Sequence, residues 1–308
     1  MHKSVLLEEL IENLVIKPDG IYVDCTGGGG GHALKVYKKL SSGGRLIILD
    51  RDKDAVKRLR EMFAGCENVT VIHSNFATVD LVLNDLGIGQ VTGLYADFGL
   101  SNYQLIDENR GFSFKKSGFL DMRMNKSDEI TAYEVVNNYP KETLVNILKK
   151  YGEEPFAARI ADSIVKKRVL KNIESTTELA SIISEAIPKK FHKHGQNPAT
   201  KSFQAIRIFI NKELESIESL LNKIDKIVEK DGRIVFISFH SLEDRLVKDM
   251  LNFYAKDCIC PPEFPECRCD KKKTFRLITK KPITPKESEI KRNPLSRSAK
   301  MRVAEKVI

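Results

Sequence analysis

Three acidic side chains in this 308-residue chain stand at the ends of apolar runs that have the length of strands. They are Asp24, Asp50 and Asp97. Short apolar runs that stop at a polar residue are typical of buried parallel strands. The carboxyl ends of parallel strands share one edge of a sheet, and ligands bind at that edge. We therefore expect the three carboxylates to gather at one ligand site.

A run of five glycines, Gly27–Gly31, follows the first of these acids. Glycine has no Cβ, so such a loop can turn sharply and bring backbone N–H groups close to a ligand. A helix over 32–40 would add further donors at its N-terminus. The order of strand, acid, glycine loop and helix favours a nucleotide-like ligand over the alternative, a flexible connection.

The spacing of the glycines argues against two common nucleotide motifs. The dinucleotide motif G-x-G-x-x-G needs a glycine where this chain has His32 or Ala33, and the phosphate loop G-x-x-x-x-G-K-[ST] is absent. The stretch from Asp24 to Gly30 reads D-x-T-x-G-x-G. It resembles the first motif of S-adenosylmethionine-dependent methyltransferases, with Thr26 in the place of the usual first glycine. An NAD-dependent oxidoreductase is the weaker alternative.

Two further residues near this edge have both a ligand-binding and a structural interpretation. Asp50 ends the second strand, where an acid commonly accepts hydrogen bonds from ribose hydroxyls. Its alternative role is to cap the next helix, and we assign that role to Asp52. Phe76 ends a third strand over 69–76 and could flank an adenine ring, although a lone Phe is more often part of a core.

A long segment with weak periodicity, residues 98–125, follows the fourth strand over 91–97. Loops of this length in compact domains are usually functional or disordered. Its aromatic residues alternate with basic ones, including Arg110 and Arg123, and this pattern favours a substrate surface. The side chains that could stack on an unpaired base are Tyr103, Phe112 and Phe114.

The rest of the chain predicts an α/β fold interrupted by helices. An amphipathic helix is expected at 1–16, and an insertion is expected to hold helices at 142–151, 155–168 and 177–187. One long helix over 200–230 then leads into a fifth strand at 232–239, and strands at 275–278 and 299–307 complete the sheet. We divide the chain into a first methyltransferase part (1–110), a helical substrate-recognition insertion (111–200) and a second part with a basic tail (201–308).

The residues HSLED, at 240–244, follow the fifth strand at the same edge. Ser241 and Asp244 have the S-x-x-D spacing of a capping box, so we assign them to the start of the next helix. His240 stays open as a substrate contact.

Net charge is +9, and the whole excess lies after residue 269. Asp270–Ile308 contains 13 Lys and Arg against 4 Asp and Glu. A basic tail favours a nucleic-acid partner, and a solvated tail is the alternative. Acids inside the N-terminal apolar stretch are not typical of a signal peptide, and apolar residues are too dispersed for a membrane span. We expect a cytoplasmic protein with no membrane segment.

Four of the six cysteines form the pattern C-x-C-x6-C-x-C, at Cys258, Cys260, Cys267 and Cys269. Four thiolates could hold a structural zinc ion. The C-x-C spacing is less usual for zinc than C-x-x-C, and reduced thiols are the alternative. The question stays open, and we assign no metal site from the sequence.

Stretches along nearly the whole chain together resemble one family, the bacterial 16S ribosomal RNA cytosine-N4 methyltransferases (the MraW or RsmH family). The most specific are RGFSF with LDMRM, within 110–124, and ISFHSLEDR, at 237–245. DFGLSNYQL (97–105) and NPATKSFQAIRIFINKEL (197–214) agree as well. One departure is Asn102, where the family usually has a second serine.

The resemblance implies a Rossmann-like S-adenosylmethionine fold with an inserted helical substrate domain. It implies methyl transfer to N4 of a cytosine in the decoding region of 16S ribosomal RNA, within the small ribosomal subunit. The cofactor contacts that it implies are Gly30, Gly31, His32, Asp50, Phe76, Asp97 and Gln104. The RNA contacts that we expect are Tyr103, Arg110, Phe112, Phe114, Arg123 and His240. A homodimer is compatible with the sequence but is not indicated by it.

The N4 amine of cytosine is a weak nucleophile because its lone pair is delocalised into the ring. Groups that accept its protons would localise that lone pair, and Asp97, Ser101 and Asn102 are the candidates. Methylation at C5 would instead need a thiolate, and the cysteines outside the late cluster, Cys25 and Cys66, do not follow the fourth strand. A non-catalytic RNA-binding protein would explain the basic tail but not the acids and glycines.

Overall fold

The computed structural model describes residues 4–192, 197–261, 263–264 and 266–308. It divides into two compact units, which we call the sheet unit (Met1–Gly99 with Leu214–Ile308) and the inserted unit (Leu100–Glu213). The expected insertion was 111–200, so the inserted unit begins earlier and ends later. The last helix of the inserted unit, α10 (Thr200–Asn211), packs on α7 (Lys141–Gly152). This packing assigns residues 201–213 to the inserted unit.

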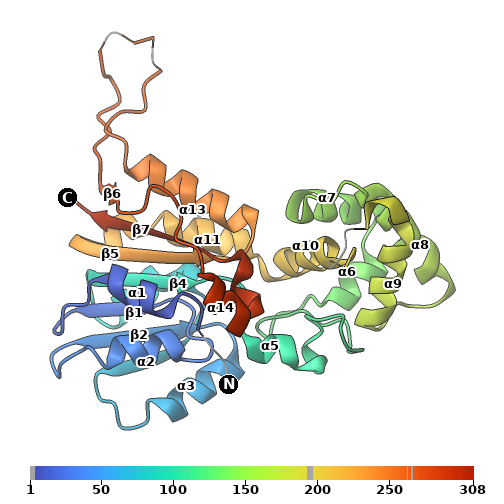
Figure 1. The fold of residues 1–308 in the computed structure, drawn as a ribbon, viewed down its shortest axis with the longest axis horizontal. Coiled ribbons are helices and arrows are strands. Elements are labelled where there is room, and N and C mark those ends of the chain that lie inside the picture. Colours follow the sequence, from blue (N-terminus) through green and yellow to red (C-terminus); the bar gives the residue numbers. More distant parts are fainter. Residues whose placement is uncertain (1–3, 193–196, 262, 265) are drawn as a thin grey trace. The chain divides into compact units, whose positions relative to one another are not determined.

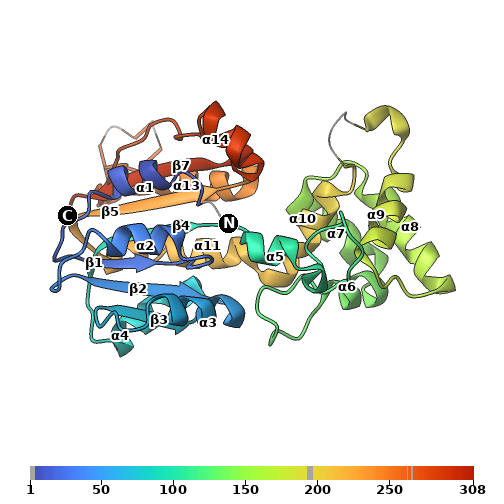
Figure 2. The same ribbon diagram turned by 60° about the horizontal axis from the view of Figure 1, so that its bottom comes forward.

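The sheet unit is built on seven strands in the order β3-β2-β1-β4-β5-β7-β6 (Figures 1 and 2). Their bounds are β1 Ile21–Asp24, β2 Arg45–Asp50, β3 Val69–His73, β4 Val91–Asp97, β5 Val228–Ser238, β6 Phe275–Leu277 and β7 Lys300–Lys306. The first five strands are parallel, and β7 is antiparallel to both of its neighbours. The predicted Rossmann-like α/β fold is confirmed.

The central strand β1 pairs with β2 on one side and with β4 on the other. The strand order reverses at β1. On one side of β1 lie β2 and then β3, and on the other side lie β4 and then β5. Ligands of open parallel sheets bind beyond the carboxyl ends of the strands at such a reversal. In this chain Asp24 and Asp97 end the two strands that meet there.

Helices cover both faces of the sheet. They are α1 (Leu7–Leu14), α2 (Gly31–Tyr37), α3 (Lys53–Met62), α4 (Val79–Asp85), α11 (Glu213–Leu221), α12 (Ile224–Ile227), α13 (Ser241–Tyr254) and the peripheral α14 (Glu287–Arg292). Successive side chains of a strand point to opposite faces. Tyr22 of β1 accordingly packs in a cluster with α1, α2 and α3, and Val23 packs in a second cluster with α4, α11, α12 and α13. Two apolar layers therefore fix the strand that carries the glycine loop.

The inserted unit is helical, as predicted. Its helices are α5 (Asn102–Ile106), α6 (Ala132–Asn138), α7 (Lys141–Gly152), α8 (Ala157–Leu170), α9 (Thr176–Ala186) and α10 (Thr200–Asn211). Within the described part of the chain, no helix is both long and apolar enough to cross a membrane.

The prediction of one helix over 200–230 was wrong. Three helices occupy this range, and Lys212, with φ of 49°, ends α10 in the left-handed conformation. Apolar side chains recur at helical steps on both sides of the break. Phe203 belongs to the inserted unit, whereas Ile217 belongs to the core under the sheet. The regular pattern hid the break because each half covers a different core.

The basic C-terminal segment is not a tail. Its residues form β6, α14 and β7, and Met301 and Val303 are fully buried. Several of its cations are held in ion pairs inside the fold. Arg302 Nε lies 2.6 Å from an oxygen of Asp244, and Lys306 pairs with Asp225. Part of the positive charge that predicted a nucleic-acid partner therefore forms ion pairs that hold β7 in the sheet unit.

Candidate functional site

The glycine loop leaves β1 at Asp24 and returns to the helix layer at α2. Gly28 and Gly30 have φ of 51° and 77°, in the left-handed region that glycine occupies without strain. The N–H of Gly27 donates to the carbonyl of Leu49 at 2.9 Å, and the N–H of Gly28 donates to Asp50 Oδ2 at 2.7 Å. The loop is thus tied to the end of the neighbouring strand β2.

Asp50 uses its carboxylate to organise this edge. Oδ2 accepts from Gly28, and Oδ1 accepts from the N–H of Asp52 at 2.8 Å. Burial raises the pKa of Asp50, an effect that the two N–H donors oppose. Each carboxylate oxygen keeps a second lone pair for a ligand hydroxyl. The helix cap predicted for Asp52 is confirmed, since its side chain accepts from Asp54 N at the start of α3.

Thr26 joins the ends of β1 and β4. Its N–H donates to Asp24 Oδ1 at 3.0 Å, and its hydroxyl oxygen accepts from the N–H of Asp97 at 2.7 Å. Asp24 is only 1 % exposed, and this burial raises its pKa from 3.8 to about 7. The threonine in the place of the usual glycine therefore has a structural reason that the sequence motif alone does not reveal.

Asp97 ends β4 with a carboxyl group that the fold leaves partly unsatisfied. Its Oδ1 is buried and has no hydrogen-bond partner within the described part of the chain. Burial raises its pKa well above the ordinary range, and the nearby carboxylates of Asp24 and Glu243 raise it further. A buried polar atom without a partner is costly. Asp97 Oδ1 is therefore the best candidate for an atom that a ligand completes.

His32, in the first turn of α2, stands beside this carboxyl group. Its ring is 7 % exposed, with Nε2 2.9 Å from the carbonyl oxygen of Val5 and Nδ1 3.8 Å from Asp97 Oδ2. A carbonyl oxygen can only accept, so Nε2 carries a proton and Nδ1 faces the acid. The structure brings His32 and Asp97 together, as a common site requires.

The capping box predicted for Ser241 and Asp244 was wrong. His240 is the residue that caps α13, because its Nδ1 accepts from Glu243 N at 3.4 Å and its Nε2 lies 3.1 Å from Glu243 Oε1. Asp244 pairs instead with Arg302 and Lys300. His240, predicted as an RNA contact, thus uses Nδ1 to cap α13, and its buried Nε2 has no hydrogen-bond partner among the described residues.

Glu243 is a residue of this edge that sequence reasoning missed. It is fully buried, its carboxylate accepts from Phe239 N at 2.8 Å, and its charge raises the pKa of Asp97. The H-x-x-E spacing from His240 was the available signal. The S-x-x-D pattern of Ser241 and Asp244, shifted by one residue, hides it.

The strand predicted over 69–76 ends at His73, and Phe76 lies three residues further on, in the 3-10 turn Phe76–Thr78 that Asn75 caps. Its ring packs on Phe98 with centroids 5.7 Å apart, and Phe98 stacks on Phe236. Phe76 is only partly buried, so one side of an aromatic cluster stays accessible at the carboxyl edge of the sheet. Its contact with an adenine ring stays a prediction.

In the inserted unit, Ser101 and Gln104 form a capping box at the start of α5. Ser101 Oγ accepts from Gln104 N at 3.3 Å, and Gln104 Oε1 accepts from Ser101 N at 3.1 Å. Asn102 is the first residue of this helix, and the side chain of Tyr103 is 46 % exposed. Of the four, Tyr103 has the exposed face that base stacking needs.

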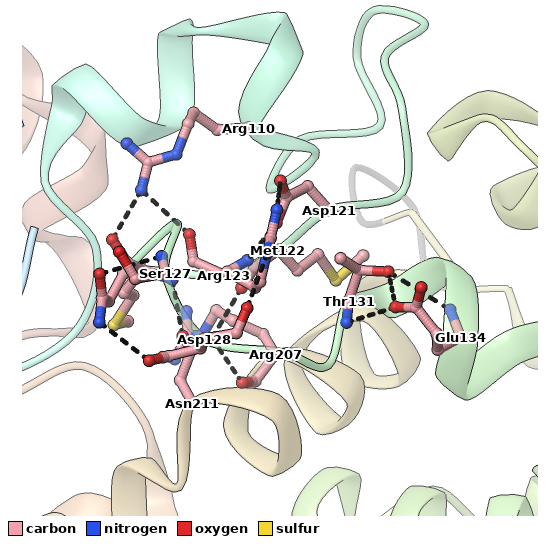
Figure 3. A network of polar contacts seen from close by, with 12 residues as sticks. Arg110, Asp121, Met122, Arg123, Ser127, Asp128, Thr131, Glu134, Arg207 and Asn211 are labelled. Carbon is pink, nitrogen blue, oxygen red and sulfur yellow. Dashed lines mark hydrogen bonds and ion pairs between the residues drawn. The ribbon is translucent and has the colours of Figure 1, made fainter.

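Arg110 and Arg123, predicted as RNA contacts, stabilise the long segment itself (Figure 3). Arg110 is 3 % exposed and donates to the carbonyls of Arg123 and Met124 at 3.0 and 2.8 Å. Arg123 donates to both oxygens of Asp121 at 2.7 and 2.9 Å. Asn211 of α10 adds bonds to the same turn. The structure argues against Arg110 as an RNA contact, because its guanidinium is buried on carbonyl groups.

The aromatic predictions in this segment divide in the same way. Phe112 is 7 % exposed, so it is part of the core and offers no face to a base. Phe114 is partly buried and meets Phe203 edge to face, with centroids 4.8 Å apart. Alternating aromatic and basic residues do not reveal which side chains turn inward.

The comparisons with known proteins decide the family. The model of the MraW methylase family matches residues 1–307. The chain belongs to this family. A protein of Caldicellulosiruptor bescii named ribosomal RNA small subunit methyltransferase H is 50 % identical over 306 residues, which cover 99 % of each chain. A protein of the same name from Clostridioides difficile is 49 % identical over 307 residues, again 99 % of each. The crystal structure of an rRNA methylase from Streptococcus thermophilus covers 100 % of this chain and 99 % of that one, with a TM-score of 0.45 and 10 % identity.

The carboxyl edge of the sheet in this MraW-family chain fits the cofactor S-adenosylmethionine. Gly28 and Gly29 leave backbone partly exposed after β1, and Asp50 keeps acceptor capacity for ribose hydroxyls. Asp24 and Asp97 place two carboxyl groups at the ends of the adjacent strands β1 and β4, where the glycine loop begins. The unsatisfied Asp97 Oδ1 marks where a donor is needed. A dinucleotide would instead need the glycine spacing that the loop lacks.

Proposed function

We propose that this protein transfers a methyl group from S-adenosylmethionine to the N4 amino group of a cytosine in the decoding region of 16S ribosomal RNA. The observation that carries the proposal is the identity of about one half, over 306 residues, with proteins named ribosomal RNA small subunit methyltransferase H. The carboxyl edge of the sheet supports it with the acids and glycines that this chemistry needs.

The cofactor contacts in this proposal are Gly30, Gly31, His32, Asp50, Phe76, Asp97 and Gln104. S-adenosylmethionine, when bound, supplies a methyl group on a positively charged sulfur. Asp50 accepts hydrogen bonds from ribose hydroxyls, and the backbone of Gly30 and Gly31 allows close approach. A Cβ on Gly31 would lie 2.0 Å from Ser4 Oγ, so this position tolerates no side chain without a shift.

Asp97 is the residue that we place at the reacting amine. Its Oδ1 accepts a hydrogen bond from the N4 amino group, so that the nitrogen lone pair is less delocalised into the ring. N4 must also lose a proton when it gains the methyl group, and the raised pKa of Asp97 suits a group that holds that proton. Ser101 and Asn102 rank below Asp97, because Ser101 Oγ already caps α5.

Methylation of the amine is favoured over methylation at ring carbon C5 by the state of Cys25. A C5 mechanism uses a thiolate as the nucleophile. The Cys25 thiol is 1 % exposed, and burial raises its pKa well above the ordinary value. A thiol in this state is a poor nucleophile.

The substrate form, the assembly state and the location belong to the same proposal. Methylation of 16S ribosomal RNA within the small ribosomal subunit places the activity in the cytoplasm. Among the expected RNA contacts Tyr103 is the most exposed, and Arg123 and Phe114 keep part of their surface exposed. A homodimer stays a prediction compatible with the sequence.

Two measurements test the proposal. Calorimetry should detect binding of S-adenosylmethionine and none of NAD. Labelled S-adenosylmethionine should then transfer label to small ribosomal subunits that lack base methylation, while large subunits serve as the control. Binding of NAD, or label in large subunits alone, would contradict the proposal.

A further inference from the structure

The connection between α13 and β6 has no role in the proposed reaction. It runs from Ala255 to Thr274, and its described residues form neither helix nor strand. Figure 1 shows it extending away from the sheet as a long loop. Loops of this length in compact domains need a function or a device that orders them.

The four cysteines of this loop converge in space. All four Sγ atoms lie within 4.8 Å of one another. Cys267 Sγ is 3.6 Å from Cys269 Sγ, which is in turn 3.8 Å from Cys258 Sγ. One C-x-C pair comes from each arm of the loop, so the cluster joins the outgoing chain to the returning chain.

These separations match a tetrahedral metal site. Zinc bound by thiolates has Zn–S distances of about 2.3 Å, which places neighbouring sulfurs of a regular tetrahedron about 3.8 Å apart. A disulfide would need sulfurs about 2.0 Å apart. All six cysteines, each of which the structure describes, are free.

Backbone N–H groups of the loop donate to three of the four sulfurs. Ile259 N donates to Cys269 Sγ, Cys260 N donates to Cys258 Sγ, and Arg268 N donates to Cys260 Sγ, each at 3.3 Å. Three of the four sulfurs therefore already accept hydrogen bonds from the backbone of the loop itself, which holds them in place around one point.

The loop also lacks the apolar burial that would order it otherwise. Ile259 is 50 % exposed and Phe264 is 48 % exposed. Cys258 and Cys267 are exposed as well. With so little buried apolar surface, a cross-link is the remaining way to hold both arms in one conformation.

We propose that Cys258, Cys260, Cys267 and Cys269 bind one structural zinc ion. The site is closed, because four protein thiolates fill the tetrahedral shell and leave no position for water or substrate. The metal cross-links the two arms of the loop and does not take part in methyl transfer.

Elemental analysis of the full-length protein, purified without chelator, tests the stoichiometry. One zinc per chain is expected, and the double variant C258S/C269S should contain less than a tenth of that amount. C66S, which removes a thiol outside the cluster, is the matched control and should keep one zinc. Reconstitution with Co²⁺ should give the intense visible absorption of a tetrahedral thiolate site.

Limited trypsin digestion tests the structural role separately. Arg268 and the lysines at 271–273 lie in or beside the cluster. Chelator-treated protein and C258S/C269S should be cut there at least tenfold faster than zinc-bound protein, with unchanged circular dichroism from the rest of the chain.

Several results would overturn the proposal. They are a protein without bound metal, iron in place of zinc, a disulfide among the four cysteines in freshly purified protein, and equal zinc contents in C258S/C269S and wild type. Equal trypsin sensitivity with and without zinc would refute the proposal that the metal holds the two arms of the loop together.

Discussion

Replacing Asp24 with Asn should stabilise the sheet unit most at alkaline pH. Asp24 is 1 % exposed, and its pKa is raised from 3.8 to about 7, chiefly by burial. A raised carboxyl pKa means that folding favours the protonated form, so stability falls as pH rises from the unfolded pKa to the folded one. Asn keeps the oxygen that accepts from Thr26 N and has no charge to desolvate.

The magnitude follows from the two pKa values. Each unit corresponds to 1.36 kcal/mol, so the ionisation of Asp24 costs about 4 kcal/mol at pH 8 and about 1.6 kcal/mol at pH 5. The difference between the two, about 2.6 kcal/mol, does not depend on how well the amide packs. The difference in the free energy of unfolding between D24N and wild type should therefore be larger at pH 8 than at pH 5 by about 2.6 kcal/mol, in favour of D24N.

Hydrogen exchange of amides in β1 and β4 is the assay, because it reports the opening free energy of the sheet without requiring the two units to unfold together. D80N is the control with the opposite sign. Lys223 holds the pKa of Asp80 low, so loss of the Asp80 carboxylate in D80N should lower the free energy of unfolding by at most about 1 kcal/mol at pH 8. The reasoning is refuted if D24N and wild type show the same pH dependence between pH 5 and pH 8.

Three further predictions follow from the same contacts. D97A should abolish methyl transfer while calorimetry still detects weakened binding of S-adenosylmethionine, and D97N should keep the fold with at least a hundredfold lower rate; complete loss of cofactor binding in D97N would leave Asp97 with the cofactor role alone. R302M should destabilise the protein by about 3 kcal/mol, because it breaks a buried ion pair with Asp244. Since Arg302 lowers the pKa of Asp244, this loss should shrink as pH falls below 4 in urea titrations, and a loss that does not change with pH would argue against the pair. K212G should stabilise the protein by about 0.5 to 1 kcal/mol in thermal unfolding, because Lys212 has φ of 49°; destabilisation would show that its side chain matters more than its backbone.

The strands and the acids at their ends could be predicted because both are local properties. Apolar runs that stop at Asp24, Asp50 and Asp97 identify strands without knowledge of their partners. The first turn of α3 was predictable for the same reason, since Asp52 caps it from two residues away. The carboxyl edge of the sheet was therefore accessible from the sequence alone.

Side-chain roles that depend on distant partners could not be predicted in this way. Arg110 and Phe112 are residue types that are common on RNA-binding surfaces. The turn at 122–124 nevertheless buries Arg110, and the core of the inserted unit buries Phe112. Asp244 was assigned to a cap because its partner, Arg302, lies 58 residues further along the chain. The helix break at Lys212 follows from two separate cores, which a single periodic pattern does not distinguish.

Identification of the methylated nucleoside tests the central claim most directly. Small ribosomal subunits that lack base methylation would be treated with the purified protein and labelled S-adenosylmethionine, and the 16S RNA would then be digested to nucleosides. The account predicts label in N4-methylcytidine and in no other nucleoside, and none with D97A. Label at C5 of cytosine, on another base or on ribose would contradict it.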